Sequence, residues 1–267
     1  MMSVELLHRP VPPRKSRFLS ALGLGRRPAP SVPENTRVYA MGDIHGCASL
    51  LDKLHQAIVR DAAGCPGDIS IIYLGDYIDR GPDSKGVIDR LVGMRGFRVR
   101  FLKGNHDAAL LDFLKNPDSY AVWRNYGAPE TLLSYGVRPP LYASPQDFKR
   151  ARDELVAVLP EDHFKFFNEL ELSVSVGDYF FAHAGARPGT ALEEQHEEDL
   201  LWIREDFLSS RNDFGKIVVH GHSPQPKAWR HSNRIGVDTG AYATGILSCV
   251  VLEGETHRFL QTGGQGA

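Results

Sequence analysis

The sequence predicts an α/β fold, because short apolar runs alternate with amphipathic, helix-like segments from residue 37 onward. Strands are predicted at 37–41, 69–74, 97–102, 172–176, 179–182, 216–219, 234–237, 246–252 and 256–260, and helices at 48–62 and 84–94. A chain of 267 residues, 42% of them hydrophobic, can bury one large core. We therefore expect two β-sheets, or one strongly curved sheet, flanked by helices.

Two parts of the chain depart from this alternation. Residues 1–35 carry six prolines and six basic residues against two acids, which is the composition of a disordered basic tail. Residues 107–170 form helical segments interrupted by proline and glycine, and we predict a helical insertion, or cap, beside the functional site. Its aromatic residues are expected to be packing residues; they are Tyr120, Trp123, Tyr126, Tyr135 and Phe148. A single domain is thus predicted over 36–262.

Charge and cysteine content argue against several classes of protein. The formal net charge is −2, with 31 basic and 33 acidic residues, so no nucleic-acid partner is expected. The cysteines, Cys47, Cys65 and Cys249, lack the spacing of a zinc clamp or a disulfide framework, and they favour a reducing, cytoplasmic location. The longest apolar stretch near the N-terminus, 18–25, is about half as long as a membrane span requires. We therefore expect no membrane span.

Polar motifs directly follow five of the predicted strands, and strand-end loops are where α/β folds place ligands. They are Gly42-Asp43-Ile44-His45-Gly46, Gly75-Asp76-Tyr77-Ile78-Asp79-Arg80-Gly81, Gly104-Asn105-His106-Asp107, His183-Ala184-Gly185 and His220-Gly221-His222. Aspartate, histidine and asparagine are ligands for manganese, iron, zinc or magnesium, and the cysteines are not clustered as a thiolate site requires. The sequence therefore predicts a catalytic metal site.

The positions of these residues indicate how two metals would be held. Asp43 and His45 lie at i and i+2, so an extended turn can point both toward one metal. Asp76 has two carboxylate oxygens and can bridge to a second metal. The remaining ligands of that second metal would be Asn105, His183 and His222. Each motif alone is weak, since a Gly-Asp pair is usually a turn, but their joint occurrence after successive strands is hard to explain as coincidence.

Taken together, the motifs resemble those of the calcineurin-like metallophosphoesterases, and within them the bacterial type of the PPP family of serine/threonine protein phosphatases. The similarity covers about residues 38–252, and the segment 75–81 adds an Asp-Arg pair that the broader superfamily usually lacks. The resemblance implies a four-layer α/β/β/α sandwich and direct attack on phosphorus by a hydroxide that bridges two divalent metals, manganese or else iron or zinc. It assigns the metal ligands to Asp43, His45, Asp76, Asn105, His183 and His222.

The resemblance also implies roles for residues around the metals. Arg80 would bind the phosphoryl group, and His106, oriented by Asp79, would be the catalytic acid. Arg204 would be a second phosphate-binding arginine, although the sequence around it departs from the eukaryotic pattern, and Tyr242 would lie near the substrate. Arginine suits this task because its planar guanidinium can bind two phosphoryl oxygens at once.

Two further segments beside the motifs are less specific. His220 lies two residues before His222, and we expect it to pack or to support a ligand in preference to binding metal. The segment Asp238-Thr239-Gly240 resembles a loop near the metals in bacterial members, but a structural turn is equally consistent with it.

The expected activity is hydrolysis of phosphate monoesters, on phosphoserine or phosphothreonine of a phosphorylated protein, on phosphotyrosine, or on a small phosphoester. A symmetrical diadenosine tetraphosphate hydrolase is the main alternative, because its motifs look similar. A catalytically silent phosphoprotein-binding module is the alternative from another class, although all proposed ligands and the acid are present. A wide basic rim on the insertion would favour the dinucleotide, and an open shallow groove a phosphopeptide. The basic residues concerned are Arg124, Arg138, Lys149, Arg150 and Arg152.

Overall fold

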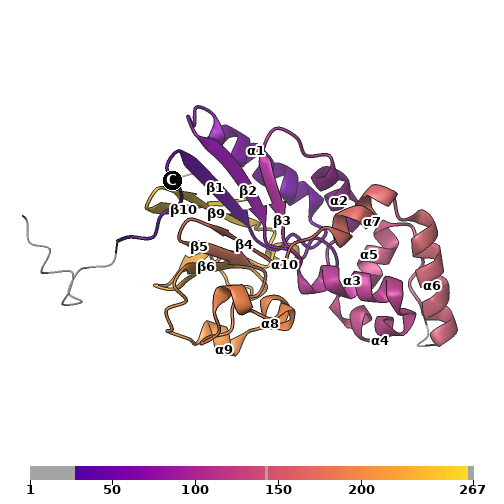
Figure 1. Ribbon diagram of the computed structural model, residues 1–267. Helices are drawn as coiled ribbons and strands as arrows, with labels where there is room; N and C mark the ends of the chain where they lie inside the picture. The colour runs from indigo at the N-terminus through magenta and orange to yellow at the C-terminus, as the bar shows by residue number, and fades with distance from the viewer. Residues whose placement is uncertain (1–27, 142–143, 264–267) are drawn as a thin grey trace, which may run out of the picture.

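The computed structural model describes residues 28–141 and 144–263, and it has two β-sheets stacked face to face (Figure 1). The first sheet has the strand order β10-β9-β1-β2-β3. Its strands are β1 (Thr36–Met41), β2 (Asp68–Tyr73), β3 (Arg98–Phe101), β9 (Ser248–Glu253) and β10 (Thr256–Gln261). β1, β2 and β3 run parallel, whereas β9 is antiparallel to β1 and to β10. The three parallel strands therefore end at the same edge of the sheet.

The second sheet has the strand order β4-β5-β6-β8-β7. Its strands are β4 (Ser173–Val176), β5 (Tyr179–Ala182), β6 (Ile217–His220), β7 (Trp229–Arg230) and β8 (Arg234–Gly236). β5, β6 and β8 run parallel, and the outer strands β4 and β7 pair antiparallel with their neighbours. This sheet, like the first, thus has a set of parallel strands whose carboxyl ends can contribute to one site.

Side-chain alternation along the strands builds the layers. β1 directs Val38 and Ala40 into the core between the sheets, where they meet Phe181 of the second sheet. The intervening residues Tyr39 and Met41 face the helices that cover the outer side of the first sheet. A third cluster covers the outer side of the second sheet. The four-layer α/β/β/α sandwich predicted from the sequence is confirmed.

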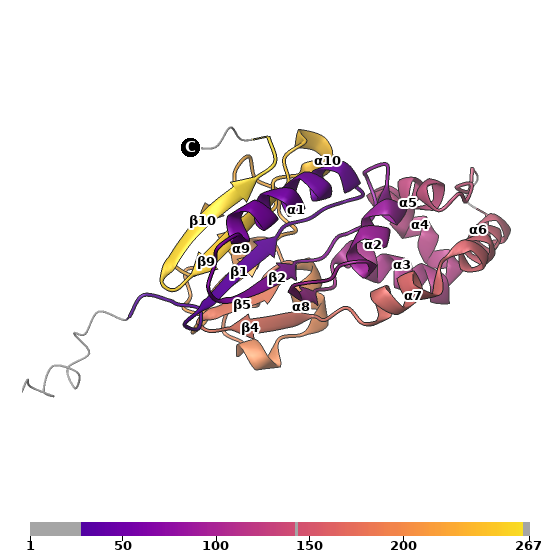
Figure 2. The ribbon, with the colours of Figure 1, turned by 90° about the horizontal axis from the view of Figure 1, so that it is seen from above.

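The helices that form the outer layers pack through apolar faces with helical spacing. α1 (Ala48–Ala62) and α2 (Ser84–Val92) cover the first sheet, and α8 (Glu197–Trp202) and α9 (Glu205–Leu208) cover the second. α1 has the predicted bounds, and it buries Leu51, Leu54 and Ile58 on one face. Figure 2 shows α1 lying along the outer side of the first sheet.

The segment predicted as an insertion lies at one end of the sandwich as a group of helices (Figure 1). They are α3 (Asn105–Lys115), α4 (Tyr120–Trp123), α5 (Ala128–Ser134), α6 (Pro145–Val158) and α7 (Glu161–Asn168), with short 3-10 turns at Pro117–Ser119 and Arg124–Tyr126. Tyr120, Trp123, Tyr135 and Phe148 are buried, and they belong to the core cluster that contains α1 and α2. These four aromatic residues are packing residues, as predicted, and the helices share a core with the sandwich.

The predicted strands agree with the observed ones to within about two residues at most ends. The sequence reading missed β7, a 3-10 turn at Leu192–Glu194 and the short helix α10 (Ala241–Thr244). β7 has two residues, which is too short to show any hydrophobic period. The helix α9 was also missed, because it spans about one turn.

The predicted tail, residues 1–35, lies outside the described residues as far as residue 27. In the described part, Val32 is buried, and its backbone N–H donates to Gly254. The backbone of Ser31 donates to the Asp178 carboxylate and accepts from the Asp178 N–H. Packing against the sandwich therefore begins before β1. Among the described residues no helix is both long enough and apolar enough to cross a membrane.

Candidate metal centre

The polar motifs meet where the parallel strands of both sheets end. Asp43 and His45 follow β1, Asp76 follows β2, Asn105 begins α3 after β3, His183 follows β5, and His222 follows β6. All six side chains are at most 5% exposed. The structure thus brings together every residue that was predicted as a metal ligand, from segments up to 179 residues apart.

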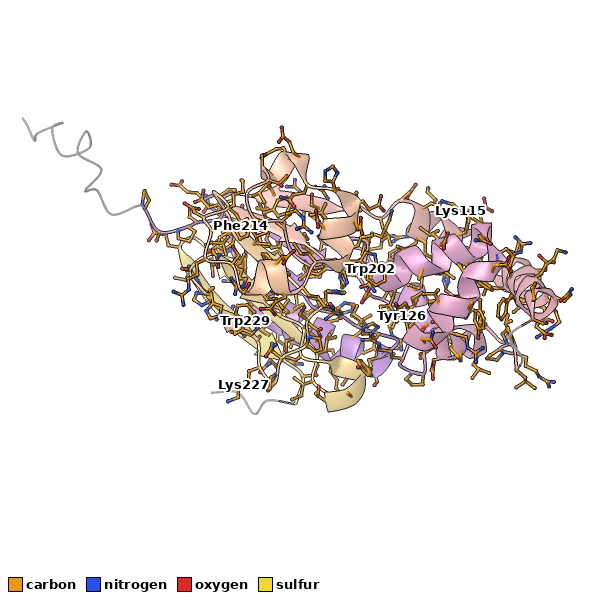
Figure 3. The ribbon with its side chains drawn as sticks, turned by 90° about the horizontal axis from the view of Figure 1, so that it is seen from below. Lys115, Tyr126, Trp202, Phe214, Lys227 and Trp229 are labelled. Carbon is orange, nitrogen blue, oxygen red and sulfur yellow. The ribbon has the colours of Figure 1, made fainter. Side chains whose placement is uncertain are left out.

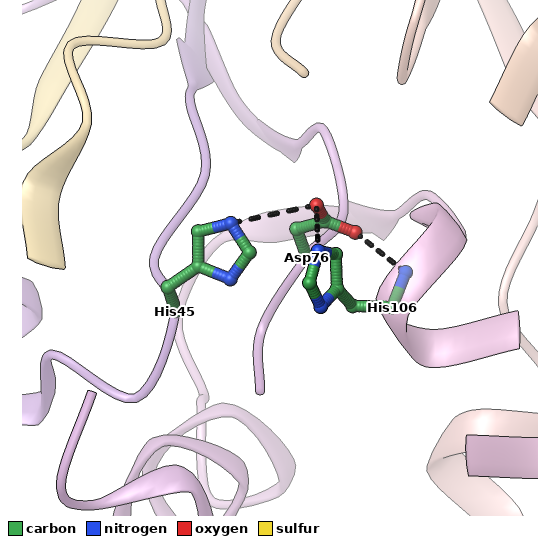
Figure 4. A group of neighbouring side chains, drawn as sticks. All are labelled: His45, Asp76 and His106. Atoms are coloured by element: carbon green, nitrogen blue, oxygen red, sulfur yellow. Dashed lines mark hydrogen bonds and ion pairs between the residues drawn. The ribbon is translucent and has the colours of Figure 1, made fainter. Parts of the chain in front are cut away.

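Asp76 stands at the centre of two groups of possible metal ligands. One group is His45, Asp76 and His106, and the other is Asp76, His183 and His222; in each, the ligand atoms lie within 4.8 Å of one another. The Oδ2 atom of Asp76 is 3.5 Å from Nε2 of both His45 and His183. The first group is drawn in Figure 4, where the backbone N–H of His106, in the first turn of α3, also donates to Oδ1 of Asp76. A carboxylate shared by two groups fits the predicted bridging role.

The hydrogen bonds of the imidazoles leave their lone pairs facing this carboxylate. Nδ1 of His45 and of His183 each lie 2.9 Å from a backbone carbonyl, which can only accept, so Nδ1 carries the proton. Nε2 of each then carries a lone pair. For His183 this lone pair faces oxygens of Asp76 and Asn105, which can only accept, whereas Nε2 of His45 faces Asp76 and also accepts from Arg80. Nε2 of His222 is buried and has no hydrogen-bond partner. Because acceptors face acceptors, the donor set fits divalent cations at this position.

The charge states of these groups also suit metal binding. Burial lowers the pKa of His45 to about 3 and that of His222 to about 2. Burial by itself would raise the pKa of Asp76, but the surrounding histidines, His183 foremost, outweigh it and hold that pKa well below its usual value. At neutral pH the centre therefore contains neutral imidazoles and an ionised carboxylate, the forms that bind divalent metals.

Asp43 and Asn105 lie beside these groups. Both carboxylate oxygens of Asp43 accept from the backbone N–H of His222, at 3.2 and 3.0 Å. Burial, and then the charges of Asp238 and Asp76, raise the pKa of Asp43 well above its usual value. Oδ1 of Asn105 lies 2.9 Å from Nε2 of His183. Two buried carboxylates that repel each other are a further sign that a cation belongs between them.

The backbone is strained at the same positions. Among the described residues other than glycine, six have a positive φ, and five of them belong to the motifs: His45, Asp76, Asp79, Arg80 and His222. Such conformations are costly and persist at functional sites, where packing enforces them. The close approach of two motifs helps to enforce them here, because a Cβ atom on Gly81 would collide with the backbone of His45 and Gly46.

Arg80 links the metal-ligand groups to the surface. Its Nη1 and Nη2 atoms each donate at 3.0 Å, to Nε2 of His45 and to Nε2 of His106. Its guanidinium carbon lies 4.8 Å from the ring centre of Tyr242, a cation-π contact. Tyr242 is on α10, is 44% exposed, and points its ring edge-on at His45, 5.4 Å away. Both side chains therefore lie beside the imidazoles of the centre, and Tyr242 is also exposed to solvent.

His106 and Asp79 form a buried pair. Nδ1 of His106 lies 2.7 Å from Oδ2 of Asp79, so Nε2 is the atom that faces Arg80 and Asp76. Burial lowers the pKa of His106, but the Asp76 and Asp79 carboxylates outweigh it and raise that pKa overall. Asp79 has two further partners that sequence reasoning did not identify, Trp123 and Thr131 of the insertion.

The remaining candidates lie around this centre. Arg204 is exposed at the start of α9, and its charge contributes, after burial, to lowering the pKa of His183 and His222. His220 packs between the rings of Phe207 and Trp229 and belongs to neither metal-ligand group.

Asp238 is buried, and burial raises its pKa to about 6. The charge of Asp238 also raises the pKa of Asp43, which places the loop 238–240 beside the centre.

Asp107 is a further structural part of the centre that the sequence reading left without a role. Its carboxylate accepts from the backbone N–H groups of Asp76, Tyr77 and Gly104, at 2.8, 3.2 and 2.9 Å. It thereby joins the loop after β2 to the start of α3. The signal was present, because Asp107 is the last residue of the Gly-Asn-His-Asp motif. No local pattern marked Trp123 or Thr131.

Two aromatic side chains, Tyr126 and Trp202, border the centre where the insertion meets α8. Tyr126 lies 5.8 Å from the ring of His106, and Trp202 lies 6.3 Å from that of His222. The two rings are 6.1 Å apart, and Figure 3 shows them on the side of the molecule seen from below. A cavity of about 430 Å³ beside them is lined by Ala108, Ala109, Asp112, Ser119, Val122, Trp123, Tyr126 and Trp202.

The sandwich, the shared carboxylate with its imidazoles and the adjacent arginine define a metal-dependent phosphoesterase. In agreement, the family model of the calcineurin-like phosphoesterases matches residues 36–251, and the chain belongs to this family.

The relatives carry more than one activity. Serine/threonine-protein phosphatase 1 of Salmonella typhimurium is 28% identical over 216 residues, which cover 79% of this chain and 89% of that protein. A symmetrical bis(5'-nucleosyl)-tetraphosphatase of Ralstonia nicotianae is 38% identical over 74 residues, covering 27% of this chain and 24% of that protein. The crystal structure of a putative diadenosine tetraphosphatase superposes with a TM-score of 0.59 at 22% identity, covering 89% of this chain and all of that one.

Proposed function

We propose that this protein hydrolyses phosphate monoesters on phosphorylated proteins, at phosphoserine or phosphothreonine, with manganese as the metal. The observation that carries the choice of substrate is the surface around the centre. The cavity beside Tyr126 and Trp202 is lined mainly by apolar side chains and contains one charged residue, Asp112. Such an open and weakly charged surface suits the side chains that flank a phosphorylated residue in a polypeptide.

Three basic residues of the insertion lie away from the cavity beside the centre or are paired with acids. Lys149 and Arg150 pair with acids one turn ahead on α6, and Arg152 pairs with Asp153. None of the three lines the cavity beside the centre. A wide basic rim, which would favour a polyphosphate chain, is therefore not supported by these side chains.

The side chains of the centre divide the chemistry among them. When bound, two divalent cations would lower the pKa of a water molecule and stabilise the negative charge of the phosphoryl group. Arg80 would bind phosphoryl oxygens with both of its terminal nitrogens, and Arg204, exposed at the start of α9, would be the second arginine. A water oxygen forms the new bond to phosphorus as the ester P–O bond breaks.

His106 would donate the proton that the leaving oxygen needs. In the described structure, Arg80 donates to Nε2 of His106, so this atom is an acceptor. A phosphoryl group that draws Arg80 to its own oxygens would free Nε2 to carry a proton, and the carboxylates of Asp76 and Asp79 favour that protonated form. Nδ1 keeps its own proton in the bond to Asp79.

A symmetrical dinucleoside tetraphosphate hydrolase remains the second candidate, and the aromatic pair favours it. Adenine stacks well on accessible aromatic rings, and the exposed Trp202 and the half-buried Tyr126 lie beside the centre. The relative from Ralstonia nicotianae bears the name of this activity.

Phosphate release from a panel of phosphoserine, phosphothreonine and phosphotyrosine peptides, with diadenosine tetraphosphate alongside, tests the proposal. The manganese-loaded protein is expected to release phosphate from the first two peptides and to leave the dinucleotide intact. Production of ADP from the dinucleotide, with no release from peptides, would favour the second candidate. Binding of a phosphopeptide without any turnover would instead indicate a binding module.

A further inference from the structure

We propose that Trp123 and Thr131, which both belong to the helical insertion, are positioning residues that fix the Asp79 carboxylate against His106. The inference rests on the proposed role of His106 as the acid. It gives the insertion a part in the chemical step, beyond covering the site and shaping the groove.

The Asp79 carboxylate is completely buried, and donors occupy both of its oxygens. Oδ2 accepts from Nδ1 of His106 and from Nε1 of Trp123, each at 2.7 Å, while Oδ1 accepts from Oγ1 of Thr131 at 2.6 Å. Two of these three donors come from the insertion. A buried carboxylate with this many donors has little freedom to rotate, so the ring of His106 has one preferred orientation.

The donors also determine which atoms carry protons. The indole N–H of Trp123 can only donate, so Oδ2 of Asp79 must be an acceptor. Oγ1 of Thr131 accepts the backbone N–H of Asp79 at 2.9 Å and donates to Oδ1 at 2.6 Å, a shorter contact than the 3.1 Å to Oγ of Ser84. Both oxygens therefore accept. Asp79 is held as a carboxylate that keeps the proton on Nδ1 of His106 and directs Nε2 toward the substrate.

The same part of the insertion supports the backbone of Asp79. Asp79 and Arg80 have φ values of 72° and 65°, a left-handed turn that residues other than glycine rarely adopt. The carbonyl of Gly127 accepts from the backbone N–H of Arg80 at 3.4 Å, and a Cβ atom on Gly127 would collide with Arg80. Contacts from α4, the following turn and α5 thus converge on two strained residues.

Trp123 is itself held firmly. It is 1% exposed, and its ring packs against Phe113 at 5.2 Å and Tyr120 at 6.2 Å. Its indole N–H reaches Asp79 from a position 44 residues away in the chain. The packing of Trp123 in this aromatic cluster therefore fixes the position of its indole N–H, which donates to Asp79.

Two conservative substitutions in the full-length, metal-loaded protein test this inference. Trp123→Phe retains an aromatic ring and removes the N–H, and Thr131→Val retains the shape of the side chain and removes the hydroxyl. We expect each to lower kcat for an alkyl phosphate about tenfold and kcat for p-nitrophenyl phosphate by less than about threefold, because only the alkoxide needs the acid. If Trp123→Phe does not fold, the kinetics of Thr131→Val alone test whether the donors to Asp79 position His106.

The matched control is Tyr120→Phe, which removes one polar group from the same aromatic cluster while Asp79 keeps its three donors. It should leave both rates unchanged. In a His106→Asn background, Trp123→Phe and Thr131→Val should cause no further change in the ratio of the two rates, because they act through His106. Equal losses for both substrates in the wild-type background would overturn the inference.

A second measurement does not depend on turnover. In the zinc-loaded protein, the Nδ1 proton of His106 is followed by proton NMR, where a hydrogen bond to a carboxylate gives a distinct downfield signal. We expect Trp123→Phe and Thr131→Val to move or broaden it, and Tyr120→Phe to leave it in place. If His106→Asn itself affects both substrates equally, the acid role fails. The NMR signal then decides about positioning, and an unchanged signal in both variants would refute it.

Discussion

Clusters of charged side chains lie at both ends of strand β1. They differ in whether their hydrogen-bond acceptors are paired with donors. At the amino end, Arg37 donates to the Asp61 carbonyl and to Glu253, and Asp61 accepts at 2.6 Å from both Tyr39 and Arg258. At the carboxyl end, Asp43 lies among carboxylates, and the lone pairs of the imidazoles face Asp76. Every acceptor of the first cluster faces a donor. In the second cluster some acceptors face one another, although Arg80 and two backbone N–H groups donate there as well.

This difference separates stability from function. A partly exposed cluster with matched partners stabilises the fold modestly, whereas a fully buried cluster of like groups is unfavourable unless something else occupies it. The strained φ values of His45, Asp76 and His222 belong to the second cluster. Mismatched polar groups therefore distinguish a site built for cations from an ordinary ion-pair network. The same substitution made in both clusters should have opposite consequences.

The largest expected effect is that of Asp76→Asn. Because Asp76 belongs to both metal-ligand groups, the variant should lose bound metal and at least about a thousandfold in kcat. Metal content by atomic spectroscopy and turnover of p-nitrophenyl phosphate measure the two effects. Asp61→Asn is the matched control, and it should retain both. An Asp76→Asn variant that keeps full activity without added metal would contradict the two-metal interpretation.

His106→Asn should have the next largest effect, and it should be selective. Although His106 lies in one of the two groups, metal content should stay the same, because the six assigned ligands remain. The kcat for an alkyl phosphate should fall by about 10²- to 10⁴-fold, because the alkoxide leaves without a proton. p-Nitrophenyl phosphate, whose leaving group needs no acid, loses much less. Steady-state kinetics on both substrates measure the ratio. A loss of the same size for each would argue against an acid role.

Asp43→Asn should stabilise the metal-free protein. The substitution removes a buried charge that Asp238 and Asp76 oppose, and the amide oxygen can still accept from the His222 N–H. We expect about 1 kcal/mol more stability in urea unfolding with a chelator present, and weaker metal binding. If the variant is less stable than the wild type under these conditions, repulsion between carboxylates does not outweigh the favourable contacts of Asp43 at this end of the strand.

Asp61→Asn should destabilise the protein by about 1 kcal/mol without changing activity, because its carboxylate is partly exposed and loses charged hydrogen bonds. Urea unfolding at neutral pH gives the value, and kcat for p-nitrophenyl phosphate is the control. A loss of activity of the same order as that of Asp76→Asn would show that the two clusters are coupled.

The smallest expected effect is the pH dependence of the difference in stability between the wild type and Asp61→Asn. Burial alone would raise the pKa of Asp61, but the bonds from Arg258 and Tyr39 lower it overall. A carboxyl whose folded pKa is depressed stabilises the protein above its unfolded pKa, and this stability is lost as pH falls through the folded pKa. The gap between wild type and Asp61→Asn should therefore be full at neutral pH and shrink below about pH 4. Urea unfolding repeated across this range measures the gap, and one that widens in acid would contradict the assignment.

The sequence by itself determined the layers and the place of the centre. The alternation of apolar residues predicted most strands, because side chains on a strand point alternately to two faces, and α1 followed from its helical spacing. Asp43, Asp76 and His183 were predicted to lie at one site because each follows a strand, and strand-end loops are where α/β folds place ligands.

Only the tertiary structure decided how these side chains are used. Which nitrogen of each imidazole faces Asp76 depends on carbonyls such as Ile78 O and Leu74 O, the latter 109 residues from its histidine. The donors to Asp79 come from Trp123 and Thr131, 44 and 52 residues away. Local patterns encode local conformation, whereas a hydrogen bond between distant segments exists only after the sheets and the insertion have packed together.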